Sequence, residues 1–377
     1  MDFTFTEEQQ AAVEAAKAVF SDVAPDAVPS PALTPGAVAE DFDRPLWTRL
    51  AAADLLGLTL DPEHGGAGLD PVALCLVLRE SARVLARVPL LETSAVALTV
   101  ERYAHPRTAA ALLPRITRGE LVLTAAAHGR TGHEPAAHAV TARRDATGWT
   151  LDGLQTAVPW AHRADVIAVP ARTTEGGTVL ALLPRTHDGL GLTDQYSTNG
   201  ELLAELRLDA VHLDDTDVID TDGAWERLRD ILTTGTCALA LGLGEAVLAM
   251  TSQYTGKREQ FGHPVATFQA VAVQTADRYI DLRAMEATLW QAAWRLSHDT
   301  DGPLPTAGDI AVAKIWASEG VRRVVQTAQH LHGGFGADTD YPLHRYHAWA
   351  KHLELSLGPA AAHEEALGDL LATHPLD

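Results

Sequence analysis

Cysteine is scarce in this sequence, and its scarcity limits the chemistry that the chain can carry. Among 377 residues there are only two cysteines, Cys75 and Cys237, and each lies among apolar neighbours. A disulfide framework or a thiolate metal site needs more cysteines, at closer and more regular spacing. We therefore expect both to be buried structural thiols.

Basic residues are also in short supply. Lys and Arg total 29 against 50 Asp and Glu, which gives a net charge of −21. Such a charge is repelled by nucleic-acid backbones and by anionic membrane surfaces, so we expect neither as a partner. An anionic ligand is still compatible with this composition wherever Lys and Arg cluster locally.

Targeting and membrane signals are missing from the sequence. The first residues include Asp2, Glu7 and Glu8, with no basic segment followed by an apolar run. We expect no signal peptide, no membrane span and a cytoplasmic location.

Histidine motifs typical of zinc are missing as well, although the chain has 17 histidines. No two of those near the C-terminus stand at the His-x-x-x-His spacing with an adjacent Glu that a zinc helix uses. We expect no metal at His330, His332, His344, His347 and His352.

What the sequence does contain is a clear succession of patterns. Residues 1–118 have helical periodicity, residues 119–222 show short period-2 runs bounded by Gly, Pro and Asp, and residues 223–377 return to long helical stretches. This order predicts an α+β fold with an N-terminal helical domain, a middle β domain and a C-terminal four-helix bundle.

The individual helices follow from the same periodicity. We expect a capping box formed by Thr6 and Gln9, and an irregular connector at 23–38. An apolar stripe of Val273, Ile280, Trp290 and Trp294 predicts core positions. The expected helices are 6–21, 47–56, 71–98, 106–119, 225–256, 264–297, 307–332 and 343–372.

Two stretches carry the strongest local signals. In KREQFGHPVATF at 257–268, Gly262 permits a chain reversal and Pro264 ends a helix, which predicts an elbow between two helices. In QHLHGGFG at 329–336, the glycines let the backbone pass close to a ligand or to another chain. Either stretch alone is also typical of an ordinary turn.

Taken together, these stretches resemble the acyl-CoA dehydrogenase family. The family's R-x-x-F-G segment with a later Gln matches Arg258, Phe261, Gly262 and Gln269, and its G-G-x-G segment matches 333–336, followed by Tyr341 and Pro342. The resemblance spans essentially the whole chain and implies the same three-domain fold. It also implies FAD as cofactor, with each flavin held between the β domain and the bundle of one subunit and the bundle of a neighbour.

The family's catalytic base is absent from both places where members carry it. Family members remove an α-proton from an acyl-CoA thioester with a carboxylate while a β-hydride passes to the flavin. Counted without gaps, the usual glutamate falls on Leu357, and the alternative position on the first bundle helix falls on Leu232, followed by Thr233. The nearest carboxylates, Glu354 and Asp230, are expected to face elsewhere on their helices.

The residues of the β domain that contact the flavin ring in the family, which form the flavin-ring wall, are also mostly replaced in this sequence. The family's Thr-Glu-Pro-Gly-Ala-Gly-Ser-Asp loop corresponds to 127–134, where only Gly132 is kept. Its Lys-x-Trp-Ile-Thr-Asn segment corresponds to Gln155–Trp160, so the ring-stacking Trp is replaced by Ala157.

The residues that would hold a neighbour's FAD are mostly kept. By resemblance these are Arg258, Phe261, Phe268, Gln269, His330, Gly333 and Gly334. An arginine donates strong hydrogen bonds to a pyrophosphate, and glycines allow close backbone approach. His330 stands where the family usually has Gln, and a histidine also donates.

This asymmetry predicts a subunit that lacks the base and completes the FAD site of a sister subunit. Heteromeric actinobacterial enzymes of the FadE type, several of which act on steroid side chains, pair such chains, and DYPLHRYHAWAKHLELSLG at 340–358 resembles that type. The expected assembly is a dimer or a heterotetramer, acting on an acyl-CoA or an acyl-carrier thioester.

Two other interpretations remain open at this point. One is a homo-oligomeric flavoenzyme of a biosynthetic pathway with a relocated base, for which the candidates are Glu354, Glu245, His128 and His133. The other is a flavin-free protein that binds an acyl thioester or catalyses a non-redox reaction in the old acyl cleft.

Overall fold

The computed structural model describes residues 4–31, 33–39, 41–130, 139–298, 302 and 304–375. Its first part is helical, as expected. The capping box is confirmed, since the Gln9 amide donates to Thr6 Oγ1 and the Gln9 side chain accepts from the Thr6 amide. The helices of this part are α1 (Glu7–Phe20), α2 (Arg44–Ala52), α3 (Pro71–Arg83), α4 (Leu90–Tyr103) and α5 (Pro106–Thr117).

The predicted helix 71–98 is wrong, because two helices occupy that stretch. α3 ends at Arg83 and α4 begins at Leu90. Between them, Leu85 adopts a left-handed φ of 52°, and Pro89 precedes the first turn of α4. Pro89 lacks the backbone N–H that a continuous helix would need, so the chain turns here.

The middle part is one sheet, mostly antiparallel, in the order β6-β7-β3-β2-β4-β5-β8, with β1 paired parallel to β4. The β3–β7 pairing is irregular between Gln155 and Val158, and both Ala157 and Trp160 have positive φ. The strands are β1 (Leu123–Ala125), β2 (Val140–Asp145), β3 (Gly148–Pro159), β4 (Val166–Thr173), β5 (Thr178–Pro184), β6 (Leu190–Tyr196), β7 (Leu202–Leu213) and β8 (Val218–Ile219).

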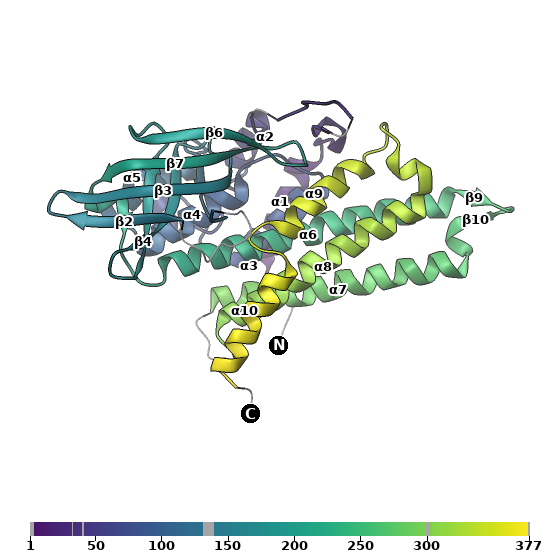
Figure 1. The fold of residues 1–377 in the computed structure, drawn as a ribbon. Helices are drawn as coiled ribbons and strands as arrows, with labels where there is room; N and C mark the ends of the chain where they lie inside the picture. Colours follow the sequence, from purple (N-terminus) through teal and green to yellow (C-terminus); the bar gives the residue numbers. More distant parts are fainter. Residues whose placement is uncertain are drawn as a thin grey trace.

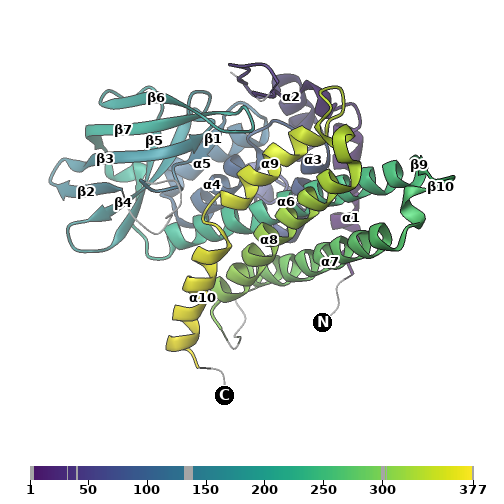
Figure 2. The same ribbon diagram turned by 45° about the vertical axis from the view of Figure 1, so that its right-hand side comes forward.

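The last part consists of long helices that pack beside the N-terminal helices (Figure 1). An elbow of two short strands, β9 (Glu259–Gln260) and β10 (His263–Pro264), joins α6 to α7 at the end of the bundle farthest from the sheet (Figure 2). The helices are α6 (Ala224–Lys257), α7 (Gln269–Ser297), α8 (Thr306–His332), α9 (Leu343–Leu355) and α10 (Ala360–Thr373).

Two predicted bounds in this part are wrong. α7 begins at Gln269 instead of residue 264, because the elbow and a short 3-10 turn at Val265–Thr267 come first. The predicted helix 343–372 is broken into α9 and α10, since Leu357 and Gly358 have φ of 58° and 99° and Pro359 follows. The α+β class with three successive parts is confirmed, while the domain limits 1–118, 119–222 and 223–377 stay a prediction.

α6 is the central helix of the structure. It packs against α3, α4, α7, α8 and α9. Among the described residues, it is also the helix with enough length and apolar content to cross a membrane, but 78% of that apolar window is buried inside the structure, as in the core helix of a folded domain. Cys75 and Cys237 are unpaired and buried in this core, as predicted.

Candidate functional site

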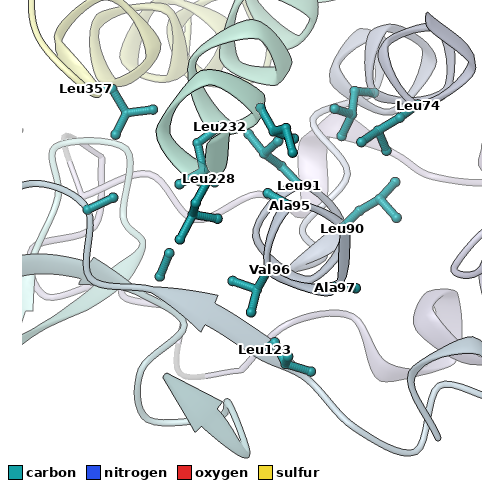
Figure 3. Close-up of a cluster of buried hydrophobic side chains, with 14 of the residues drawn as sticks. Leu74, Leu90, Leu91, Ala95, Val96, Ala97, Leu123, Leu228, Leu232 and Leu357 are labelled. Carbon is teal, nitrogen blue, oxygen red and sulfur yellow. The ribbon is translucent and has the colours of Figure 1, made fainter. Parts of the chain in front are cut away.

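Both positions expected to carry a base lie inside an apolar cluster. Leu357, in the break between α9 and α10, is 4% exposed, and so is Leu232 on α6. Figure 3 shows the two side chains among buried leucines, alanines and valines that include Leu91 and Ala95 of α4 and Leu228 of α6. This cluster offers no proton acceptor where the family has one.

The backbone around Leu357 is held in place by a buried lysine. Lys314 on α8 is completely buried and donates from Nζ to the carbonyls of Leu353 and Glu354, at 3.2 and 3.1 Å, and to Ser318 Oγ at 2.7 Å. These carbonyls end α9 and have no partner within the helix. Burial lowers the pKa of Lys314 to about 8.

The carboxylates named as relocated bases have partners of their own. Glu354 forms an ion pair with Lys351 at 2.5 Å. Glu245 lies on the far side of α6, where it forms ion pairs with Arg79 and Arg83 of α3. Neither side chain lines the cavity beside Leu357.

Asp230 has a different environment from the other carboxylates near the base positions. It lies near Arg229, with 3.8 Å between Nη2 and Oδ1, and burial raises its pKa to about 6. It lines a separate groove between α6, α8 and α10, and Leu357 stands between that groove and the cavity.

An interdomain cavity lies where α4, α6, α9 and the sheet meet, with about 950 Å³ of empty space that includes its open mouth. Its walls are mainly leucine and alanine. The polar or aromatic side chains that line it are Ser81, Glu92, His128, Trp160, Asn199, Glu201, Thr236, Trp349, His352 and Ser356. His128, one of the candidate bases, therefore does face this cavity, while His133 lies outside the described residues.

Glu92 is a functional candidate that the sequence reasoning missed. It stands on α4 and lines the cavity, where burial raises the pKa of its carboxyl to about 7, although Trp160 donates a side-chain hydrogen bond to it. The available signal was a single carboxylate inside the apolar run LLETSAVAL. A lone acid at such a position either has a partner or has a raised pKa.

At the distal end of the bundle, the glycine loop packs against the end of α6 that leads into the elbow. The Tyr254 ring, one turn before Arg258, stacks on His332 at 4.4 Å and on Phe335 at 5.2 Å between ring centroids. The end of α6 and the glycine loop are therefore neighbours, although they are far apart in the chain (Figure 1).

The side chains of this distal end face outward. Phe261 is 92% exposed at a left-handed φ of 53°, and its ring contact within the chain is Phe268, at 6.4 Å. Arg258, Gln269 and His330 are exposed as well. An aromatic ring left this open is typical of a surface that another molecule covers.

The glycine loop has open space around its backbone. Gly333 has φ of 61° and ψ of −138°, a conformation that essentially requires glycine. A Cβ added to Gly333 or Gly334 would meet nothing within 4 Å in this chain. Packing within the chain therefore does not explain a glycine at 334, whereas close approach of another molecule would.

The predicted core stripe on α7 is wrong at two positions. Trp290 is buried, at 7% exposure, and Trp294 is half-buried, but Val273 is 52% and Ile280 is 64% exposed. The N-terminal half of α7 carries an apolar face that the described part of this chain does not cover. This face continues from the exposed elbow at Phe261 and Phe268.

Comparison with known proteins decides the family. A model of the acyl-CoA dehydrogenase N-terminal domain matches residues 6–120, and a model of the C-terminal domain matches residues 231–371. Acyl-CoA dehydrogenase FadE27 from Mycobacterium tuberculosis is 34% identical over 339 residues, which cover 89% of this chain and 90% of FadE27. The chain belongs to the acyl-CoA dehydrogenase family.

Two solved structures are similar over almost the entire chain. The ChsE4-ChsE5 complex from Mycobacterium tuberculosis matches with a TM-score of 0.91 and 32% identity, covering 100% of both chains. A variant of the Tcur3481-Tcur3483 steroid ACAD matches with a TM-score of 0.88 and 36% identity, covering 97% of this chain and 98% of the other. Solved proteins of this fold contain FAD or FADH2.

The residues of this acyl-CoA dehydrogenase chain do not fit a flavin ring of its own. Pro159, at the position of the family's hydroxyl-bearing residue, has neither a hydroxyl nor an N–H. The Ala157 amide and the Thr156 hydroxyl both donate to Gln195 Oε1, at 2.7 and 3.0 Å, so these groups are already used. The family's aromatic wall is replaced by Ala157, and residues 131–134 of the pyrimidine-binding loop lie outside the described residues.

The distal end does fit a share in FAD bound by a neighbouring family member. Exposed Arg258, Gln269 and His330 are donors for pyrophosphate and adenosine oxygens, and the glycine loop leaves room for close approach. When bound, FAD supplies the hydride acceptor of the family's reaction. The role of these residues in holding it remains a prediction.

Proposed function

We propose that this chain is the base-lacking subunit of a heteromeric acyl-CoA dehydrogenase, and that it takes part in FAD-dependent α,β-desaturation of an acyl-CoA by completing its partner's FAD site. One observation carries the proposal. Both base positions are buried leucines, whereas the residues for a neighbour's FAD are exposed at the distal end of the bundle.

In this arrangement each chain has a separate task. Arg258 donates to the pyrophosphate, Gln269 and His330 donate to the adenosine half, and the Gly333–Gly334 backbone lies against it. Phe261 and Phe268 exclude water from that contact. The partner supplies the carboxylate base and the wall for the flavin ring, because Leu232 and Leu357 carry no proton-accepting group and the segment Gln155–Trp160 is altered.

The similar structures support a heteromeric assembly. One match is a complex of two differently named chains, ChsE4 and ChsE5, and the other is the pair Tcur3481-Tcur3483, described as a steroid ACAD. We extend both features to this chain: a sister acyl-CoA dehydrogenase as partner, with FAD shared between them, and a steroid or another bulky acyl thioester as substrate. The proposed location is the cytoplasm.

A second candidate rests on a specific observation. Glu92 faces the interdomain cavity with a pKa near 7, which suits a general base at physiological pH. A homo-oligomeric flavoenzyme with Glu92 as its relocated base would need a flavin ring in that same cavity. The altered segment Gln155–Trp160 argues against this ring.

The FAD content per chain separates the candidates. The protein is purified alone and then co-expressed with a sister acyl-CoA dehydrogenase, and flavin is measured by absorbance together with acyl-CoA oxidation. We expect flavin and activity only in the complex. About one reducible flavin per chain in the isolated protein would favour the relocated base, and colourless protein in both preparations would favour a flavin-free function.

Arg258→Ala in the complex tests the half-site directly. Loss of the arginine removes charge-assisted hydrogen bonds, so the complex should bind FAD roughly ten- to a hundredfold more weakly although the partner's own sequence is untouched. Lys257→Ala is the matched control, because Lys257 is a neighbouring cation that is also exposed. Equal FAD affinity in both variants would contradict the proposed role of Arg258.

A further inference from the structure

The interdomain cavity contains buried hydrogen-bond donors that have no partner within the described residues. Asn199 is 1% exposed, and its Nδ2 lacks a partner, as does the buried Nε1 of Trp349. Both side chains line the cavity. Because a buried N–H without an acceptor is costly, such groups in native proteins usually meet a ligand or an ordered water.

The orientation of Asn199 is fixed by its other end. The Glu201 amide donates to Asn199 Oδ1 at 3.1 Å, so the oxygen of the side-chain amide is used and the NH2 group is the one left over. The turn that carries Asn199 is tied to α9 by the contact of Ser197 Oγ with His352 Nδ1 at 3.2 Å. Trp349 lies one helical turn before His352, so both donors come from this junction.

The charges around the donors select among ligands. Glu201 is 5% exposed and forms an ion pair with Arg87 at 2.6 Å, while Glu92 on the opposite helix is a second carboxyl. Burial lowers the pKa of His352 to about 4, so this imidazole is uncharged at neutral pH. A ligand carboxylate would face two carboxyl groups and no free cation among the described lining residues, whereas an uncharged carbonyl oxygen would not be repelled.

We propose that this cavity binds an uncharged, apolar carbonyl compound without flavin, its carbonyl oxygen accepting from Asn199 Nδ2 and Trp349 Nε1. The leucine-rich walls would cover the hydrocarbon part. The inference is independent of the proposed half-site, which lies at the distal end of the bundle.

Three matched probes test the proposal on the full-length chain. They are 2-undecanone, the alkane of the same length and the corresponding carboxylate, titrated at neutral pH while the fluorescence of the cavity tryptophans is followed. We expect the ketone to bind at least about threefold more tightly than the alkane, and the carboxylate to bind more weakly than the ketone. Equal affinity for ketone and alkane, or no binding up to the solubility limit, would overturn the proposal.

Two variants locate the donors. Trp349→Phe keeps an aromatic ring but removes the N–H, and Asn199→Asp keeps the oxygen that accepts from Glu201 while removing the NH2 donor. Each should raise the dissociation constant for the ketone about three- to tenfold and leave that for the alkane unchanged. A Trp349→Phe variant that binds ketone as the wild type does would remove this residue from the site, and flavin displaced by the ketone would identify the cavity as a cofactor site instead.

Discussion

Leu357 is the residue on which the count from the glycine motif places the family's glutamate. In the structure it has a left-handed backbone conformation and a buried side chain. Its φ of 58° puts it in a conformation uncommon for leucine, and its side chain is 4% exposed among other leucines. The side chain is therefore suited to a hydrophobic cluster and carries no group that could accept a proton.

Restoring the carboxylate at this position should not restore catalysis. Leu357→Glu would place a charged group in an apolar cluster and lower the free energy of unfolding by roughly 2–4 kcal/mol, as measured by urea unfolding. We expect no dye reduction with acyl-CoA by the isolated variant, because the ring wall is still altered at Gln155–Trp160. Leu357→Gln is the uncharged control, and flavin-dependent activity gained only by the Glu variant would contradict our interpretation of that wall.

Single residues also show where prediction from sequence reached its limit. Leu232 and Leu357 were placed by counting from glycines and prolines, and the structure brings both to one buried cluster. Glu92 could not be placed in the same way, because no motif marks it and its raised pKa comes from burial in a cavity whose other walls are distant in sequence. Asn199 and Trp349 share that difficulty, since only the fold brings both of them to one cavity.

The C-terminal end of helix α9 is stabilised by a side chain from another helix. Lys314 of α8 donates to two terminal carbonyls of α9, and the chain turns at Leu357 directly afterwards. A buried ammonium thus fixes the geometry between α9 and α10.

This end of α9 should give the protein a pH-dependent stability. The pKa of Lys314 is lowered from 10.5 to about 8, so between these values the unfolded chain binds more protons than the folded chain and stability rises with pH. Relative to Lys314→Met, the wild type should gain about 1–3 kcal/mol of unfolding free energy between pH 7 and pH 10, measured in urea. Lys351→Met on the exposed side of α9 should show no such change, and a constant difference between wild type and Lys314→Met would contradict the lowered pKa.

Helix existence was easier to predict than helix bounds. The periodicity identified every long helical stretch, but it joined α3 to α4 and α9 to α10 because apolar residues continue through both breaks. Pro89 and Pro359 were visible at these breaks and could have divided the helices. The left-handed backbone conformations of Leu85 and Leu357 could not have been predicted from the sequence, since leucine has no preference for that conformation.

At the scale of the whole molecule, the N-terminal half of α7 has an apolar face that the described part of this chain leaves exposed to solvent. Periodicity predicted core positions at Val273 and Ile280, which is wrong for this chain, because a pattern of apolar residues cannot tell whether the covering surface belongs to the same chain. Val273 and Ile280 are exposed in this chain, in continuity with the elbow, so we expect the sister subunit to cover them.

Charges on this face should prevent assembly without unfolding the chain. The double variant Val273→Glu and Ile280→Glu changes side chains that are already exposed, so its thermal unfolding should stay close to that of the wild type. Sedimentation should show the loss of the larger species formed with the partner. Tyr196→Glu, at a side chain of the sheet that is 62% exposed, is the matched control, and unchanged assembly of the double variant would place the interface elsewhere.

The exposed face also has a consequence for synthesis in the cell. A chain made in excess of its partner would present Phe261, Val273 and Ile280 to everything around it, and such surplus chains are substrates for chaperones, proteases and aggregation. If the sister subunit covers this surface, balanced production of the two polypeptides becomes a requirement of the fold itself. Genes that are transcribed and translated together would meet that requirement most simply.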